Sequence, residues 1–371
     1  MQKCFIKLAT VLVLIVLFSC TRKPEGFVID GTVTGFADSV MLYLHDPDTQ
    51  ENIDSSYIIN GKFQFNGKLI EPKRLYVNNK FTNMETYRYT SFFVENSEIQ
   101  LTGDYNDFRY CQVKGSESQD IENLLVEKVK DIDKERDSLI DIYYAKRHEL
   151  GEKEQNNLYN RVNILDSLND SYRLWLIKNY TNSYAALEKL KYRMTETPKD
   201  SLQKVYDMLN DTFKNTQNAK HIKTYIDSRL VEIGEPFIDF EAVDINGNPF
   251  KLSDVKKDYI LLDFWSAGCG PCRMANKELA KNYNELKDNL EIISFSLDMK
   301  KEWMEKASAE DSIQWTNVSD QKGFNSIVAI QYKIRGIPCS FLINKERMVV
   351  KQFLGYSPEL VDKIKKAMAE S

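Results

Sequence analysis

The stretch Tyr259-Ile260-Leu261-Leu262-Asp263-Phe264-Trp265, followed after three residues by Cys269-Gly270-Pro271-Cys272, decides the fold of the C-terminal part of this chain. A short, nearly continuous apolar run predicts a buried strand of a parallel sheet. Beyond the cysteines, apolar residues recur at spacings of four, three and four, which indicates one face of a helix: Leu279, Tyr283, Leu286 and Leu290. The cysteine pair therefore falls where a strand passes into the N-terminus of a helix.

This position favours redox chemistry at the cysteine pair. Backbone N–H groups and the positive end of the helix dipole stabilise a thiolate there. Two cysteines three positions apart can also close a small disulfide ring. A bare Cys-x-x-Cys also occurs in zinc sites and in plain disulfides, so the pattern alone leaves three kinds of site open.

Two further segments bear on this choice. The segment from Asp263 to Cys272 resembles the active-site stretch of thioredoxins. The segment from Tyr332 to Pro338 resembles the loop that carries the cis-proline of that family, and an apolar strand, Ser340 to Asn344, follows it. The resemblance spans about Glu232 to the C-terminus and is closest to the TlpA/ResA-like branch of thiol-disulfide oxidoreductases, whose members begin with a segment like Gly234 to Phe240.

The resemblance implies an α/β thioredoxin-like domain at residues 232–371, with a central mixed sheet flanked by helices. It implies a cis peptide bond before Pro338. Cys269 would be the nucleophile, Cys272 the resolving thiol, and Asp263 the buried acid that assists deprotonation of Cys272. Residues expected to support the site or bind substrate are Trp265, Gly270, Pro271, Ile337 and Pro338.

The dipeptide Gly270-Pro271 indicates the direction of the reaction. Thioredoxin carries the same pair and has a reduction potential of about −270 mV, against about −120 mV for the oxidant DsbA. We therefore expect a disulfide reductase that acts on protein or peptide disulfides. It would need no cofactor beyond its own dithiol, and the resemblance suggests a DsbD-like membrane protein as its electron donor.

Two other classes of function compete with this interpretation. Thiol peroxidases of the AhpC/TSA type carry a Pro-x-x-x-Thr-x-x-Cys pattern, which is absent from the residues between Leu261 and Cys269. A metal-handling module would usually add a histidine to the cysteines, and the chain has three, all before residue 232: His45, His148 and His221. Cys339, directly after Pro338, is either a third thiol near the pair or a threonine-sized residue that begins a strand. No metal ligand is predicted.

The N-terminus has the pattern of an export signal. Lys3 and Lys7 precede an apolar run from Leu8 to Phe18, which is too short for a membrane span and suited to a signal peptide. The ending Leu17-Phe18-Ser19-Cys20 resembles a bacterial lipobox, with residues 1–19 removed, a lipid on Cys20 and a tether at 20–26. The alternative is an ordinary secretory signal. We expect a protein of the bacterial cell envelope, lipid-anchored and facing the periplasm.

Composition agrees with a multidomain globular protein. The chain has 371 residues, 42% apolar and 28% charged, with a net charge of −5. Since charges of both signs are mixed and no basic stripe is present, we expect no nucleic-acid partner. After removal of Cys4 and lipidation of Cys20, four cysteines remain, too few for a disulfide framework.

Residues 27–115 are expected to form a small β-sandwich or barrel. Short aromatic or β-branched runs alternate there with turn residues: Phe27–Ile29, Val40–Leu44, Tyr57–Ile59, Phe63–Phe65, Leu75–Val77, Phe92–Val94 and Ile99–Leu101. Asn60-Gly61 suits a hairpin turn with two positive φ angles. This stretch resembles an uncharacterised β-domain of envelope proteins, in which Cys111 is either a buried hydrophobe or a reactive thiol.

Residues 116–231 carry a helical period, as in Leu158, Val162 and Leu165. The region would be either a spacer between the anchor and the redox module or a docking platform.

Overall fold

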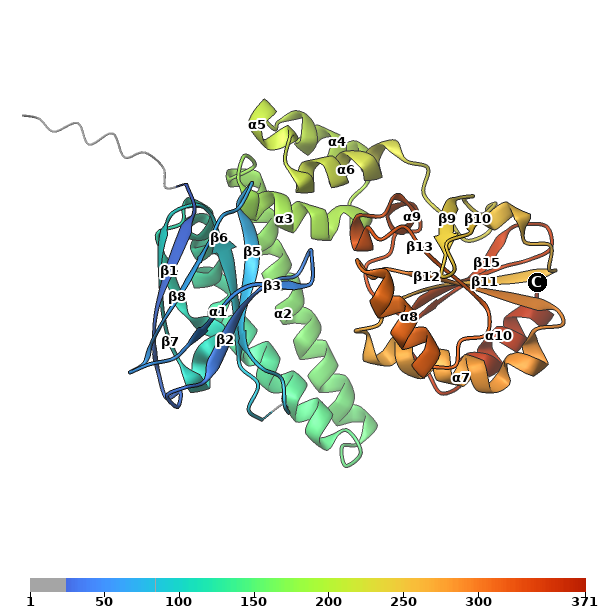
Figure 1. Cartoon of the computed structure of the whole chain (residues 1–371), viewed down its shortest axis with the longest axis horizontal. Coiled ribbons are helices and arrows are strands. Elements are labelled where there is room, and N and C mark those ends of the chain that lie inside the picture. Colours follow the sequence, from blue (N-terminus) through green and yellow to red (C-terminus); the bar gives the residue numbers. More distant parts are fainter. Residues whose placement is uncertain (1–24, 84) are drawn as a thin grey trace, which may run out of the picture.

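The structure is a computed structural model that describes residues 25–83 and 85–371. The expected signal peptide and Cys20 lie outside these residues. Figure 1 shows three parts in chain order, a β-sandwich, a helical region and an α/β domain, which is the predicted fold class. In the described part of the chain, no helix is long and apolar enough to cross a bilayer.

The N-terminal part is a sandwich of two four-stranded sheets, ordered β4-β1-β7-β8 and β3-β2-β5-β6. Its apolar side chains alternate inward along the strands and form one core, with Phe65, Leu44 and Leu101 fully buried. The Asn60-Gly61 turn has the predicted positive φ angles of 50° and 71°. The strands are β1 (Phe27–Thr34), β2 (Met41–Asp46), β3 (Glu51–Tyr57), β4 (Lys62–Gly67), β5 (Lys73–Asn79), β6 (Tyr89–Val94), β7 (Glu98–Asp104) and β8 (Gln112–Lys114).

Two strands differ from the sequence prediction: β3 is displaced from the expected position, and β8 was not expected. Of the expected strand Tyr57–Ile59, only Tyr57 belongs to a strand: it ends β3, which begins at Glu51 and pairs with β2 as an antiparallel hairpin. Ile59 makes only an isolated bridge to Lys62. The sequence of β3, Glu-Asn-Ile-Asp-Ser-Ser-Tyr, is polar because β3 is the outer strand of its sheet and is largely exposed. A pattern search for apolar alternation misses such a strand.

The helical region begins with a long antiparallel pair, α1 and α2, that packs beside the sandwich (Figure 1). Ser116 caps α1, and four shorter helices follow α2. The helices are α1 (Glu117–Lys146), α2 (Glu152–Asn179), α3 (Tyr184–Arg193), α4 (Lys199–Asp207), α5 (Asp211–Lys214) and α6 (Gln217–Asp227). A buried ion cluster joins this region to the sandwich, because Arg74 of β5 contacts both Glu122 of α1 and Glu188 of α3.

The C-terminal domain has a seven-stranded mixed sheet, ordered β10-β9-β13-β12-β11-β14-β15. Strands β11, β12 and β13 are parallel, and the others pair antiparallel. The strands are β9 (Glu241–Asp244), β10 (Pro249–Lys251), β11 (Tyr259–Trp265), β12 (Leu290–Ser296), β13 (Thr316–Ser319), β14 (Cys339–Ile343) and β15 (Val349–Leu354). The predicted buried strand is β11, which lies inside the sheet between β12 and β14 and is buried on both faces.

Helices cover both faces of this sheet. Helices α7 and α10 pack on one face around Leu261, Leu279 and Ile364, while α9 packs on the other around Phe264. The helices are α7 (Gly270–Leu286), α8 (Lys301–Glu310), α9 (Ile327–Gln331) and α10 (Leu360–Ala369). The predicted helical pattern therefore holds to Leu286, whereas Leu290 begins β12.

The α/β domain is attached to the helical region along α6 and α9. The backbone N–H of Val231 donates to the carbonyl of Gln331 at 2.8 Å, and His221 of α6 lies 3.1 Å from the Asn325 Oδ1 atom. Ile330 of α9 packs into the core of the helical region. The two parts therefore share a packed interface.

Candidate active site

The cysteine pair lies at the N-terminus of α7, as the sequence predicts. Cys269 is the N-cap residue, with Gly270 and Pro271 in the first turn and Cys272 fully buried. The two sulfur atoms are joined in a disulfide, so the structure represents the oxidised state. The Cys272 N–H points at the Cys269 sulfur, 3.1 Å away. After reduction, this N–H and the helix dipole would stabilise a thiolate on the partly exposed Cys269.

The loop before β14 approaches the same sulfur. The Ile337–Pro338 peptide bond is cis, as predicted, and the Ile337 carbonyl oxygen lies 3.6 Å from the Cys269 sulfur. A free backbone edge beside a reactive sulfur offers an extended substrate chain a place to pair. Trp265, by contrast, is fully buried and packs against Cys272. Trp265 therefore supports the cysteine pair from the interior of the domain, where a substrate cannot reach it.

Asp263 lies on the same face of β11 as the buried cysteine. Side chains alternate along a strand, so Leu261, Asp263 and Trp265 share one face. Leu261 packs in the core that contains α7, and Trp265 packs against Cys272. This alternation places the Asp263 carboxyl beneath α7, between these two contacts.

The environment of Asp263 raises its proton affinity. The side chain is 1% exposed, and burial raises its pKa from 3.8 to about 6, opposed by the Ser340 hydroxyl, which donates to Oδ1 at 2.7 Å. Within the described chain, Oδ2 has no hydrogen-bond partner. Ser294, the neighbour of Asp263 on β12, accepts a 2.8 Å hydrogen bond from the Trp315 indole. A carboxyl with this pKa can accept a proton near neutral pH.

Among the described residues, two cysteines outside the pair, Cys111 and Cys339, are free thiols of low reactivity. Cys339 is the first residue of β14, is 2% exposed and packs in the core of the domain. Burial raises its pKa to about 11, and that of Cys111 to about 12. Since the thiolate is the reactive form, both are poor nucleophiles at neutral pH, and Cys339 has the role of a residue that begins a strand.

A cavity of about 760 Å³ opens beside Cys269, and sequence reasoning missed most of its lining. Asp298 is 2% exposed and accepts the Ala267 N–H at 3.0 Å, and burial raises the pKa of its carboxyl. Arg273 bonds the carbonyl of Ala267 at 3.3 Å and forms ion pairs with Glu310 and Asp311. Asp298 follows the carboxyl end of the parallel strand β12, where ligand-binding residues gather in open α/β sheets. That signal could have identified it.

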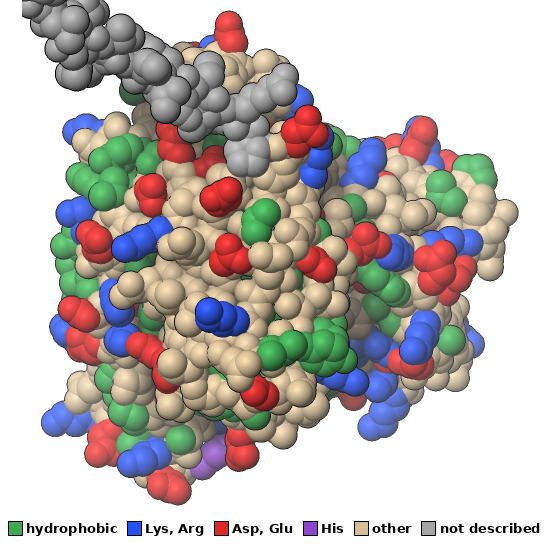
Figure 2. All heavy atoms as spheres, turned by 60° about the vertical axis from the view of Figure 1, so that its left-hand side comes forward, with side chains coloured by type: hydrophobic (Ala, Val, Ile, Leu, Met, Phe, Trp, Pro, Cys, Tyr) green, Lys and Arg blue, Asp and Glu red, His purple; other side chains and the backbone are tan. Residues whose placement is uncertain are grey.

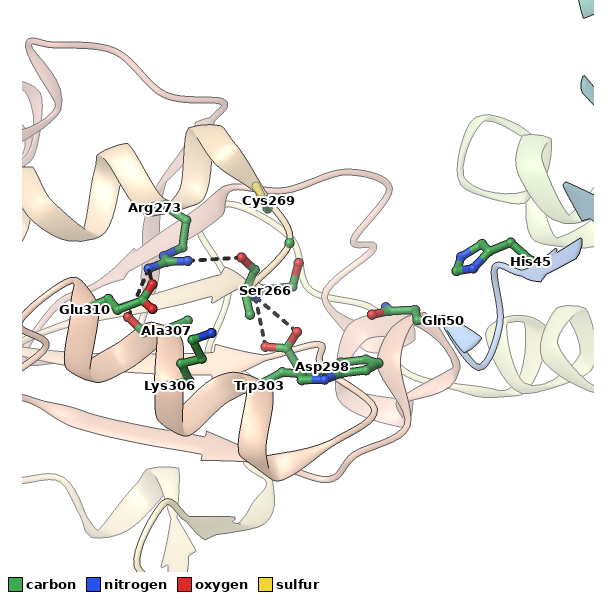
Figure 3. Close-up of a pocket in the computed structure, with 12 residues that line it drawn as sticks. His45, Gln50, Ser266, Cys269, Arg273, Asp298, Trp303, Lys306, Ala307 and Glu310 are labelled. Carbon is green, nitrogen blue, oxygen red and sulfur yellow. Dashed lines mark hydrogen bonds and ion pairs between the residues drawn. The ribbon is translucent and has the colours of Figure 1, made fainter. Parts of the chain in front are cut away.

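The opposite wall of this cavity comes from the β-sandwich. His45 and Gln50, from the β2–β3 hairpin, face Cys269, Asp298 and Trp303 across the opening (Figure 3). The described residues contain no group of three His, Cys, Asp or Glu side chains placed to hold a metal ion.

Comparison with known proteins agrees with this division of the chain. Residues 233–352 match the model of the AhpC/TSA family, and residues 27–121 match DUF4369, a domain of unknown function. The thiol-disulfide oxidoreductase ResA of Bacillus thuringiensis is 29% identical over 140 residues, which cover 35% of this chain and 75% of that protein. The thioredoxin-like protein YneN of Bacillus subtilis is 25% identical over 122 residues, covering 32% and 69%.

Among solved structures, the thioredoxin domain of a thiol-disulfide oxidoreductase from Bacteroides vulgatus is 33% identical, with a TM-score of 0.35. The match covers 37% of this chain and 99% of that one. By the two family models and the ResA match, the chain joins an N-terminal DUF4369 domain to a thioredoxin-like AhpC/TSA domain similar to ResA, and its chemistry is that of a thiol-disulfide oxidoreductase.

Proposed function

We propose that this protein reduces protein disulfides in the bacterial cell envelope through Cys269 and Cys272. The observation that supports this most is the asymmetry of the pair, one sulfur partly exposed at a helix N-terminus and the other buried behind it. In the reduced protein the Cys269 thiolate attacks a substrate disulfide, forming a mixed disulfide and releasing one substrate thiolate. The Cys272 thiolate then attacks Cys269, which re-forms the disulfide and releases the second.

The direction of this exchange is the first point to test. Because the Gly270-Pro271 pair is shared with thioredoxin, we expect a reduction potential of about −270 mV. Equilibration with glutathione or dithiothreitol buffers, followed by mass spectrometry of the alkylated protein, measures it. A potential above about −180 mV, the value for a disulfide isomerase, would contradict a reductase.

The substrates can be captured directly. In a Cys272→Ser variant the mixed disulfide on Cys269 has no resolving thiol, so bound partners stay attached. A Cys269→Ser variant is the matched control, since it keeps one cysteine but cannot begin the reaction. Partners present with the first variant and absent with the second are substrates or the electron donor, for which we propose a DsbD-like membrane protein.

We also propose that residues 1–19 are a signal peptide and that Cys20 carries a lipid. The mature chain would then comprise a tether at 20–26, a β-domain at 27–115, a helical region at 116–231 and the redox domain at 232–371. Metabolic labelling with a fatty acid tests this proposal. Label incorporated by the natural chain and lost in a Cys20→Ser variant supports it, and equal labelling of both would refute it.

A second candidate function is thiol peroxidase activity, which the AhpC/TSA match favours. The Pro-x-x-x-Thr-x-x-Cys pattern is absent, although Ser266, which also carries a hydroxyl, stands where that pattern has threonine and lines the cavity. Peroxide would oxidise Cys269 to a sulfenic acid with release of water. If the protein consumes peroxide at a rate equal to its rate of insulin reduction, the peroxidase function is favoured. If it consumes peroxide no faster than free thiols do, the peroxidase function is excluded.

A further inference from the structure

The β2–β3 hairpin of the N-terminal domain is braced where it approaches the active site. Lys73 of β5 bonds Asp46 at 2.7 Å and Asp48 at 2.8 Å, which fixes the base of the hairpin turn. At the tip, Gln50 has a φ of 58°, in the left-handed region that favours glycine. Figure 3 shows its side chain directed toward Trp303 and Asp298. Gln50 therefore carries a large polar side chain at a backbone conformation in which glycine would have the least strain.

Two contacts tie the surroundings of Cys269 to other parts of the chain. Glu51, next to Gln50, forms an ion pair with Lys300 at the start of α8. On the other side, Arg335 in the loop that carries Pro338 forms an ion pair with Glu196 of the helical region. These ion pairs tie α8 and the Pro338 loop to the N-terminal parts of the chain, and Cys269 lines a cavity whose opposite wall belongs to the β-sandwich.

From this arrangement we infer that the β2–β3 hairpin is the second wall of the substrate site and that it selects disulfides carried on short or unfolded chains. This inference rests on the proposed disulfide reductase function. Cavities of roughly 300–1,000 Å³ hold small ligands, so a space of about 760 Å³ takes a few residues of an extended chain and excludes a folded domain.

The lining of the cavity fits a polypeptide. The Trp303 ring supplies an apolar surface, and His45 and Gln50 supply polar groups on the opposite wall. The Ile337 carbonyl, beside the Cys269 sulfur, supplies a backbone acceptor. An extended chain presents both apolar side chains and free N–H groups, and it can pair with such an edge while its cysteine reaches the sulfur.

The test separates access to Cys269 from catalysis, using the full chain in its reduced form. Access is measured as the rate of Cys269 modification by N-ethylmaleimide and by a maleimide that carries a polyethylene glycol chain. Catalysis is measured as reduction of a disulfide-linked pair of short peptides and of a surface disulfide in a folded protein. Gln50→Trp adds bulk to the wall, and Thr49→Trp, at an exposed neighbour outside the cavity lining, is the matched control.

We expect Gln50→Trp to slow reduction of the peptide disulfide by roughly tenfold, the lower range of a steric misfit in a binding pocket, while Thr49→Trp leaves it unchanged. Glu51→Lys breaks the pair with Lys300 and should raise the rate of the bulky maleimide by up to about fivefold, the range of an exposed ion pair. In the same Glu51→Lys variant, the rate at which the surface disulfide of the folded protein is reduced should rise by a similar factor. Adding Lys300→Glu to Glu51→Lys should restore the natural rates.

The outcomes distinguish this inference from the proposed function. Two results would show that the hairpin is not a wall of the site. In one, the natural chain reduces both disulfides, and Gln50→Trp and Thr49→Trp reduce them at the same rates as each other. In the other, the bulky and the small maleimide modify Cys269 equally fast. If the maleimide rates change as expected but no disulfide is reduced, the wall exists and the reductase function is wrong.

Discussion

Replacing Asp263 by asparagine should remove a pH-dependent cost to the stability of the redox domain. Burial raises the pKa of this carboxyl from 3.8 to about 6 in the folded state. The folded protein therefore binds the proton more tightly than the unfolded chain, and stability falls as pH rises from about 4 to 6. The difference corresponds to about 3 kcal/mol at about 1.4 kcal/mol per pKa unit.

An asparagine cannot ionise, so it escapes this cost at every pH. It keeps an acceptor for the Ser340 hydroxyl, but its NH2 group takes the place of Oδ2, which has no partner in the described part of the structure. A buried unsatisfied group costs about 1–3 kcal/mol at all pH values. The net effect at pH 7.5 is therefore between about zero and 2 kcal/mol of stabilisation, while the change between pH 4 and pH 7.5 stays near 2–3 kcal/mol.

The measurement is denaturant unfolding of the oxidised protein at pH 4 and pH 7.5, for the natural chain, Asp263→Asn and Asp258→Asn. Asp258 is exposed just before β11 and is the matched control. The free energy difference between Asp263→Asn and the natural chain should become more favourable to the variant as pH rises. A difference that is equal at both pH values would show that Asp263 ionises normally, which would refute the argument from burial.

The same variant tests catalysis. If Asp263 accepts the proton of Cys272, its loss should slow insulin reduction at pH 7 by about 100-fold, the lower end for a general acid–base group. If the Asp263→Asn variant is more stable but reduces insulin at an unchanged rate, Asp263 takes no part in the mechanism. The argument that burial raises its pKa would still hold.

Three further predictions follow from other parts of the molecule. Iodoacetamide should label Cys269 of the folded, reduced protein at pH 7.5 and spare Cys339, because burial raises the pKa of Cys339 to about 11; equal labelling by peptide mapping would contradict this. Burial lowers the pKa of His221 to about 4, so stability should be complete above pH 6.5 and fall by about 3 kcal/mol as pH drops to 4. In unfolding curves His221→Gln should lack this loss, whereas His148→Gln, at an exposed histidine, is the matched control and should keep it. Arg74→Met removes one of the two cations that pair with the buried carboxylates of Glu122 and Glu188, and Lys189 is left as their partner. The variant should therefore cost up to about 3–5 kcal/mol in thermal or denaturant unfolding.

Much of the site could be predicted because its determinants are local in sequence. An apolar run, a short turn and a helical period place Cys269 at the cap of α7 and Cys272 beneath it. The cis bond before Pro338 was predicted from the resemblance of its loop, since sequence alone favours trans. The inner strands of the sandwich were found for the same reason, because alternating apolar residues mark a half-buried strand. Strand β3 was missed because its position at the sheet edge allows it to be polar.

By itself, then, the sequence determined the chemistry of the cysteine pair and the order of the three parts, because short-range patterns of apolar residues and turns encode local structure. Only the tertiary structure decided what surrounds the pair. Pairing of β11 with β14 brings Ser340 to Asp263, and packing of the sandwich against the helices brings Gln50 to Cys269. These neighbours are far apart along the chain, and their meeting depends on sheet register and domain packing, which no local pattern specifies.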